Sequence, residues 1–385
     1  MRYDYTTMLD IKFIVENKDI IKLGAKKKHL TVDVDRLVEL DAKRRELKPD
    51  DAAFADIIKE WRMLMLEVPN IPDMSVPEGE SETDNKEVRR WSKNDPEDGE
   101  PQKVSFAAKG HRELMTALGM LDAERGAKVS GADASFLKRD GVVMANAVQF
   151  YAQQFFIRRG SEPMMTPVLL RREPFFGTGT LPQHEEELYK TQDGEYLATT
   201  PEAATMGYHM NELLDKAELP KRYLSFSHGF HRGADDHEAL TLQQVVLCEA
   251  SHQTSVEEHD ALTQHIEEFI QSLGIAYRVV VSCGADLGLG QVKKLAIEVW
   301  MPSAKQYRKI STVSYFHDFQ TRRLNIRYRD EKGVIRFAHS VSAIAFSLVP
   351  MIEAVVENFQ REDGSILVPE VLRGFLGKDV IEKNN

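Results

Sequence analysis

Residues 277–283 read Tyr-Arg-Val-Val-Val-Ser-Cys, and residues 295–302 and 307–315 read Leu-Ala-Ile-Glu-Val-Trp-Met-Pro and Tyr-Arg-Lys-Ile-Ser-Thr-Val-Ser-Tyr. Short runs that are rich in β-branched and aromatic residues are typical of β-strands. Similar runs occur at 162–170, 223–230 and 243–251. Few of these runs have the spacing of βαβ units, so the sequence predicts an antiparallel sheet flanked by helices over residues 105–385. The predicted fold class is therefore α+β.

The N-terminal part of the chain predicts a short helical hairpin within residues 1–68. Apolar residues in the stretch 50–68 follow the spacing of one helix face: Phe54, Ile57, Ile58, Trp61, Leu64, Met65 and Val68. A similar stripe begins at Val34 and stops before Pro49. Arms of about 15 to 19 residues would be about 22–28 Å long. Residues 69–104 are rich in proline and acidic residues and are interpreted as a linker. Apolar patterns also predict helices over 255–273 and 343–357.

The amino-acid composition excludes several classes of protein. The chain has 385 residues and a net charge of −11, which argues against a protein that coats nucleic acid through a broad basic face. Its two cysteines, Cys248 and Cys283, exclude a disulfide scaffold and favour a reducing compartment. The sequence has no apolar run long enough to span a membrane. We therefore expect a cytoplasmic protein without membrane contact.

The order of several segments along the chain resembles that of bacterial-type seryl-tRNA synthetases, a family of class II aminoacyl-tRNA synthetases. These segments include VPNIPDMSVPEGESETDNKEVRRW at 68–91, IEVWMPSAKQYRKIS at 297–311, DFQTRRLNIRYRDEKG at 318–333 and NFQREDGSILVPEVLRGFLG at 358–377. The resemblance covers nearly the whole chain. It implies a dimeric class II catalytic fold behind an N-terminal helical hairpin, which in the family is a longer coiled coil that holds the variable arm of the serine tRNA.

The resemblance also assigns candidate site residues. Thr200-Pro201-Glu202 matches the Thr-x-Glu loop that binds the amino acid, and Gln320 lies in the matching segment Asp318-Phe319-Gln320. Arg232 is taken as the first arginine of the second class II motif, although strict alignment places His231 there. Glu249 matches the acidic residue that ends the same strand. Pro167 matches the proline of the first motif, which implies a place in the dimer interface.

At three positions this chain lacks residues that the family uses to bind ATP, its divalent ion and serine. Lys309 replaces the glutamate that binds a divalent ion between the phosphates of ATP, and an ammonium group has no lone pair for a metal. In the third motif, Ile344 replaces the serine of the substrate pocket and Pro350 replaces the arginine that holds the γ-phosphate. The segment Ile344–Val356 is accordingly interpreted as a core helix opened by a proline. These changes predict poor binding of ATP and Mg²⁺.

The sequence leaves the question of enzymatic activity open between two main hypotheses. The first is a diverged paralogue without serine–tRNA ligase activity, which acts as a dimeric binding or regulatory protein. It would form a homodimer, or a heterodimer with an active seryl-tRNA synthetase, and bind tRNA weakly or not at all. The second is an enzyme that uses ATP and Mg²⁺ to activate serine or another carboxylate as an adenylate. A ligand sensor with a rebuilt pocket is a third class.

A cluster of polar residues near the second motif is the other feature that could bind a ligand. His228, His231 and His237 lie close in sequence to Asp235, Asp236 and Glu238. Their spacing fits no standard pattern of metal ligands, so we interpret them as an exposed polar loop rather than a zinc site. We predict no resident metal ion, and ATP and Mg²⁺ are expected as cofactors only under the second hypothesis, that of an adenylate-forming enzyme.

Overall fold

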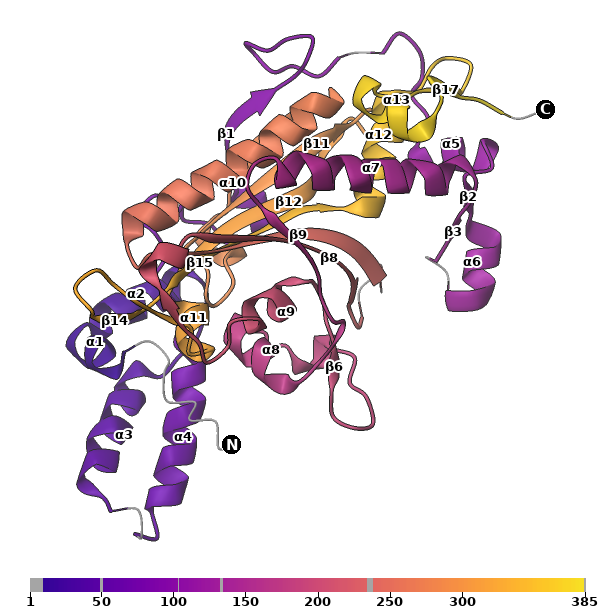
Figure 1. Cartoon of the computed structure of the whole chain (residues 1–385). Coiled ribbons are helices and arrows are strands. Elements are labelled where there is room, and N and C mark those ends of the chain that lie inside the picture. The colour runs from indigo at the N-terminus through magenta and orange to yellow at the C-terminus, as the bar shows by residue number, and fades with distance from the viewer. Residues whose placement is uncertain (1–9, 49–50, 103, 132–133, 234–237, 384–385) are drawn as a thin grey trace.

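A twisted sheet of eight strands forms the centre of the computed structural model, which describes residues 10–48, 51–102, 104–131, 134–233 and 238–383 (Figure 1). In spatial order the strands are β1 (Lys86–Trp91), β10 (Tyr277–Val281), β11 (Lys293–Met301), β12 (Gln306–His317), β15 (His339–Ser347), β9 (Glu238–Cys248), β8 (Lys221–Phe230) and β4 (Glu162–Met165). All neighbours are antiparallel except β4 and β8, which run parallel.

Long helices cover one face of the sheet and short helices lie against the other (Figure 1). The long helices are α7 (Asp140–Ile157), α10 (His252–Leu273) and α12 (Leu348–Asn358). The short helices are α8 (Arg172–Thr178), α9 (Glu202–Gly207) and α11 (Phe319–Arg323). We call the first face the back face and the second the front face. Val279, Ile297, Val313 and Val341 belong to the main core and are fully buried. The antiparallel sheet flanked by helices is therefore confirmed.

The N-terminal part consists of four helices at one end of the body (Figure 1). They are α1 (Ile11–Glu16), α2 (Lys18–Lys27), α3 (Val34–Glu46) and α4 (Phe54–Glu67). The helices α3 and α4 form the predicted hairpin, with 13 and 14 residues. The side chain of Asp33 caps α3 by accepting from the backbone of Arg36. Leu37, Trp61 and Met65 meet in a separate small core.

The remaining elements are short and connect the layers. The helices are α5 (His111–Ala117), α6 (Ala123–Ser130) and α13 (Glu370–Leu376), together with single 3₁₀ turns at Glu82–Asp84, Glu185–Glu187, Lys216–Glu218 and Gly284–Asp286. The strands are β2 (Leu121–Asp122), β3 (Phe136–Leu137), β5 (Leu169–Leu170), β6 (Tyr196–Leu197), β7 (Leu213–Asp215), β13 (Arg327–Arg329), β14 (Ile335–Phe337), β16 (Ile366–Leu367) and β17 (Val380–Ile381).

Two local predictions differ from the structure. Residues 86–91, inside the predicted linker 69–104, form the edge strand β1 and pair with β10. The predicted helix over 343–357 is wrong in its first part, because residues 339–347 form the strand β15 and the helix α12 begins only at Leu348. The segment is apolar on almost every side, so its pattern could not separate a buried strand from a buried helix.

Candidate functional site

The front face of β15 carries polar side chains that are buried beneath the short helices. Along this strand Val341 and Ala343 are fully buried in the main core, whereas Ser340 and Ser342 belong to the opposite face and are also buried. Successive residues of a strand point to opposite sides of a sheet. The strand therefore separates a core face from a polar face, and the polar face forms the floor of the candidate site.

A chain of hydrogen bonds joins three elements above this floor. Gln320 of α11 donates from Nε2 to Glu202 Oε1 over 3.0 Å, and Ser340 of β15 donates from Oγ to Gln320 Oε1 over 2.8 Å. Glu202 is the first residue of α9, and its backbone N–H donates to Thr200 Oγ1 over 3.3 Å. The structure therefore brings together three predicted site residues, Thr200, Glu202 and Gln320.

Glu202 is partly exposed as a residue, but its carboxyl group is buried, and the surroundings of that group decide its charge. Burial raises the pKa of Glu202, while hydrogen bonds from Gln320 and Ser342 act in the opposite direction without cancelling the rise. A carboxylate in such a place gains from a ligand that carries an ammonium group, because the ligand replaces the lost hydration of the anion. Glu202 is therefore equipped to hold an amine.

A second set of polar groups extends the floor toward β8. Gln243 Nε2 donates to Ser342 Oγ over 2.6 Å, and the hydroxyl groups of Thr205 and Ser225 lie 2.6 Å apart. Within the described residues, Gln243 Oε1 is buried without a hydrogen-bond partner. A buried acceptor without a donor is costly unless a ligand or water supplies one. The floor can therefore accept a hydrogen bond from a bound molecule.

Lys309 lies on β12, and its ion pair is with a residue outside the Glu202–Gln320 chain. Its Nζ is 2.8 Å from Glu82 Oε2, and both side chains are exposed. Burial acts to lower the pKa of Lys309, but the hydrogen bond and the charge of Glu82 outweigh it and raise that pKa. Lys309 is therefore a cation bound to a carboxylate. The lysine at this position has no lone pair to offer Mg²⁺, so the residue does not fit a metal ligand, and we derive no step through such an ion.

Ile344 and Pro350 do not share one helix, which corrects the prediction for Ile344–Val356. Ile344 lies on β15, where it pairs with Thr312 of β12 and Gln243 of β9. Ile344 lies two residues after Ser342 on the same strand, so its side chain points to the same, polar face. Pro350 is the third residue of α12, within the first turn, where its missing N–H breaks no intrahelical hydrogen bond. An apolar side chain therefore stands on the floor of the site.

Two other predicted residues lie apart from the Glu202–Gln320 chain. The carboxylate of Glu249 is 3.0 Å from Lys216 Nζ, and Lys216 also binds Glu331. Arg232 is exposed, and its backbone N–H donates to the carbonyl oxygen of Glu187 over 2.9 Å. Asp235, Asp236 and His237 lie outside the described residues. The structure therefore ties Glu249 to a lysine and leaves Arg232 facing solvent.

Sequence reasoning missed Ser340 as a site residue. The alternation of Ser340 and Ser342 with Val341 and Ala343 was the available signal, but the helix prediction over the neighbouring residues concealed it. Pro167 is exposed and lies two residues beyond the edge strand β4.

The described residues contain one group of three acidic or imidazole side chains whose donor atoms all lie within 4.8 Å, namely His184, Glu186 and Glu187. All three are exposed. Exposed carboxylates commonly cluster without an ion, so this group alone indicates no metal site. Within the same part of the chain, no helix is both long and apolar enough to cross a membrane.

Comparison with known proteins places the chain and its fold in one family. Residues 188–359 match the family model described as tRNA synthetase class II core domain (G, H, P, S and T). A serine–tRNA ligase of Caldicellulosiruptor saccharolyticus is 34% identical, in an alignment that covers 97% of this chain and 100% of the relative. The chain belongs to the seryl-tRNA synthetase family. The predicted resemblance is therefore confirmed.

Solved structures agree with this family assignment. A seryl-tRNA synthetase from Pyrococcus horikoshii, complexed with ATP, has a TM-score of 0.89 and 28% identity, and the match covers 98% of this chain and 100% of that one. A cytoplasmic serine–tRNA ligase from Naegleria fowleri, complexed with AMP, has a TM-score of 0.87 and 27% identity, with 98% and 99% covered. This chain therefore shares the seryl-tRNA synthetase fold over nearly its whole length.

Proposed function

We propose that this member of the seryl-tRNA synthetase family is a cytoplasmic binding or regulatory protein without serine–tRNA ligase activity. The observation that carries the proposal is the ion pair between Lys309 and Glu82. It occupies the position at which the family resemblance implies a carboxylate that binds Mg²⁺. A protonated lysine cannot bind a cation, and its partner Glu82 is already neutralised by it.

Ile344 and Pro350 support the same conclusion. Catalysis of adenylate formation depends on groups that neutralise the triphosphate and hold it for attack. The side chain of Ile344 offers no hydrogen bond at the floor of the site, and Pro350 offers no charge to a phosphate. With Lys309 they alter three positions at once, so reversal of one of them is not expected to restore the reaction.

The short N-terminal hairpin supports weak tRNA binding. The helices of 13 and 14 residues are about 20 Å long. The C. saccharolyticus relative aligns over 427 positions, 42 more than the 385 residues of this chain, so it carries at least 42 residues that this chain lacks. Near the tip, Lys43 pairs with Glu39, and both Arg44 and Arg45 pair with Asp41. Neighbouring carboxylates therefore compensate these basic groups.

We further propose that the protein is a dimer through the side of the sheet that ends in β4. This strand is an edge, and the side chain of Met165 on it is 93% exposed. Leu169 and Phe150 are exposed hydrophobic residues on the neighbouring β5 and α7. An open edge with apolar side chains fits a second subunit. The second subunit is a copy of this chain or an active seryl-tRNA synthetase.

Pyrophosphate exchange with ATP and serine tests the loss of ligase activity. We expect the wild-type protein and the Thr200→Ala variant to give the same background, because neither assembles a complete phosphate site. Exchange that is clear in the wild type and lost in Thr200→Ala would overturn the proposal. Each of the other amino acids is tested in the same way, so that a changed specificity is not mistaken for inactivity.

An ATP-dependent ligase of changed specificity is the second candidate function, and the Glu202–Gln320–Ser340 chain favours it. This chain preserves a buried carboxylate that suits the ammonium group of an amino acid. Thermal unfolding with each amino acid at millimolar concentration, with and without ATP and Mg²⁺, separates the hypotheses. Stabilisation by an amino acid alone indicates a sensor, whereas stabilisation that needs ATP together with pyrophosphate exchange indicates a ligase.

A further inference from the structure

The hydrogen bonds of the candidate site run in one direction, toward Glu202. Ser340 donates to Gln320, and the amide nitrogen of Gln320 donates to Glu202 over 3.0 Å. On the other side, Gln243 donates to Ser342 over 2.6 Å, and the hydroxyl of Ser342 is bonded to the carboxyl group of Glu202. An ionised carboxylate only accepts hydrogen bonds, so both paths end on it. This arrangement supports the anionic form of Glu202, which a positively charged ligand can contact.

The single hydrogen of the Ser342 hydroxyl fixes the orientation of Gln243. Because Ser342 donates this hydrogen to Glu202, its oxygen accepts from the amide nitrogen of Gln243. The other end of that amide, Gln243 Oε1, has no hydrogen-bond partner within the described residues, although Gln243 is only 2% exposed. A buried acceptor of this kind is stabilised by a ligand that donates a hydrogen bond. A ligand that fits the floor therefore carries a second donor besides its ammonium group.

The two acceptors lie close enough to contact one small molecule. Glu202 and Gln243 are joined through the hydroxyl of Ser342 by two hydrogen bonds, so the bonded oxygen of Glu202 and Gln243 Oε1 are no more than about 8 Å apart. Ile344 pairs with Gln243 across β15 and β9, and its side chain adds apolar surface beside the amide. Thr200, Glu202 and Ile344 are each partly exposed, so solvent reaches the floor. A short carbon chain with a donor at each end fits these groups.

The partners of the Glu202 carboxyl group within the described part of the chain are neutral, namely a side-chain amide and a hydroxyl. The two arginines of α11 bind other groups. Arg322 Nε lies 2.6 Å from Asp318 Oδ2, and Arg323 donates to two backbone carbonyl oxygens at 3.1 and 3.3 Å. Glu202 therefore brings a negative charge to the floor that these arginines do not neutralise.

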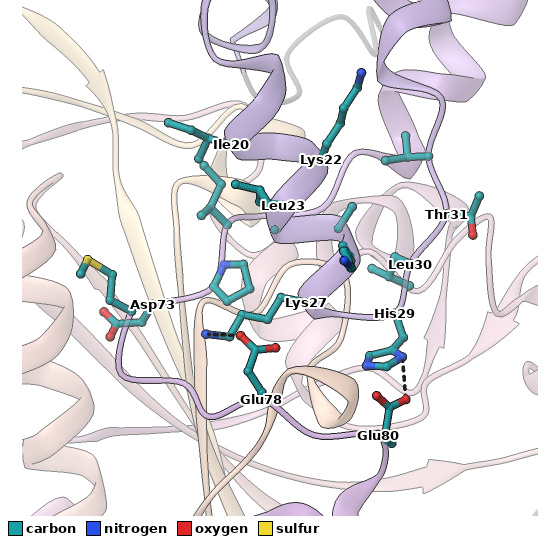
Figure 2. Close-up of a pocket in the computed structure, with 17 residues that line it drawn as sticks. Ile20, Lys22, Leu23, Lys27, His29, Leu30, Thr31, Asp73, Glu78 and Glu80 are labelled. Carbon is teal, nitrogen blue, oxygen red and sulfur yellow. Dashed lines mark ion pairs between the residues drawn. The ribbon is translucent and has the colours of Figure 1, made fainter.

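Carboxylates in another hollow of the molecule have basic partners instead. This hollow has a volume of about 960 Å³ and lies beside α2 (Figure 2). There Glu78 lies 3.6 Å from Lys27 Nζ, and Glu80 lies 3.5 Å from His29 Nδ1. A ligand at that place would have to compete with these pairs. At Glu202 a cationic ligand adds the charge that the surrounding protein groups do not supply, so binding gains an ion pair without breaking one.

We propose that the Glu202 site binds a small primary amine without an acidic group, of the amino alcohol class, in preference to the corresponding amino acid. The ammonium group contacts Glu202, the hydroxyl group donates to Gln243 Oε1, and the carbon chain lies against Ile344. An amino acid would bring a second carboxylate next to Glu202, where like charges repel each other. The inference rests on the proposed function, that of a binding protein without ligase activity, and names the class of its ligand.

Calorimetric titration of the full chain with matched ligands tests the proposal. Serinamide and serine share an amine and a hydroxyl group, but only serine carries a carboxylate. We expect ethanolamine and serinamide to bind, and serine to bind at least about ten-fold more weakly than serinamide. Ethylamine lacks the hydroxyl group and is expected to bind about ten-fold more weakly than ethanolamine, because Gln243 Oε1 then stays without a donor.

Variants of the floor separate recognition from a purely structural effect. Gln243→Met removes the free acceptor, so it should lower the affinity for ethanolamine to that for ethylamine and leave the affinity for ethylamine unchanged. Glu202→Gln should weaken the binding of both amines by about ten-fold or more. Glu186→Gln is the matched control, because Glu186 is an exposed carboxylate outside this floor, and it should leave both affinities unchanged. Circular dichroism checks the folding of each variant.

The comparison of serine with serinamide uses the wild-type protein, so it decides even if a variant is unstable. Serine that binds as tightly as serinamide would overturn the inference. A tight serine complex that is lost in Arg232→Ala would assign the carboxylate to that arginine, with the same consequence. Amines that do not bind while pyrophosphate exchange stays at background would overturn this inference alone, whereas clear exchange with serine would overturn the proposed function as well.

Discussion

The ammonium group of Lys28 lies 2.6 Å from the carbonyl oxygen of Gln291. The same group donates to the carbonyl oxygens of Gly288 and Leu289, at 3.0 and 2.9 Å. Lys28 is the C-cap residue that follows the helix α2, and it is only 2% exposed. Burial lowers the pKa of Lys28 well below its usual value. One side chain thus fastens the N-terminal helices to a turn of the catalytic-type body.

Replacement of Lys28 by methionine is expected to destabilise the protein. The three carbonyl oxygens would lose their donor, and a hydrogen bond to a charged group contributes about 1.5–3 kcal/mol. Because removal of the charge also removes a desolvation cost, we expect a net loss of about 1–3 kcal/mol in the free energy of unfolding. Urea denaturation measures it. Lys26→Met, on the exposed side of the same helix, is the control and should change this free energy by less than about 0.5 kcal/mol.

Glu202 makes the stability of the folded protein depend on pH. Because burial raises its pKa in the folded state, the folded protein holds this proton more tightly than the unfolded chain does. Protonation of Glu202 therefore stabilises the folded protein fully below the pKa of the unfolded chain. This stabilisation decreases as pH rises through the pKa of the folded protein. Glu202→Gln should raise the melting temperature at pH 7 and have little effect at pH 4. A gain of equal size at both pH values would contradict this origin.

Gly229 allows the loop that carries Thr200 to lie against β8. A Cβ atom at Gly229 would collide with the carbonyl oxygen of Thr199. We expect Gly229→Ala to cost about 1–3 kcal/mol of unfolding free energy through overpacking, and to displace Thr200. Gly374→Ala is the matched control, because no atom lies within 4 Å of its added Cβ and it belongs to α13. The control should stabilise by about 0.4–1 kcal/mol. Thermal unfolding compares the two variants.

Met165 on β4 tests the proposed interface. Its side chain is 93% exposed in the single chain. Met165→Asp places a charge on the edge strand and is expected to shift the protein from dimer to monomer, which sedimentation velocity measures. Met74→Asp is the matched control, because Met74 is 98% exposed but belongs to the segment beside α2. Equal behaviour of both variants would place the interface elsewhere.

The elements with a clear period were predictable from the sequence. The hairpin helices α3 and α4 follow their apolar stripes, and the strands β10, β11 and β12 follow their β-branched runs. The strand β1 was missed because its residues Lys86, Glu87, Arg89 and Arg90 give a charged segment with little burial. It is held by backbone pairing with β10 and by the ion pair of Arg89 with Glu267, neither of which has a local pattern.

The candidate site was predictable residue by residue only through resemblance. Glu202 and Gln320 are 118 positions apart, and no local pattern links them. The pairing of Lys309 with Glu82 spans 227 positions, so the sequence could reveal the lysine but not its partner. The helix prediction over 343–357 failed because Ile344 and its neighbours are apolar on both sides of the boundary at Ser347.

The two faces of β15 have separate tasks, which has a consequence for how such a protein diverges. Val341, Ala343 and Ala345 are buried in the main core, whereas Ser340, Ser342 and Ile344 belong to the face of the candidate site. Substitutions at every second residue can therefore change the face of the candidate site while the side chains of the main core stay the same. The residues that line the site can thus change one at a time during evolution, while the core residues that alternate with them along the strand are kept.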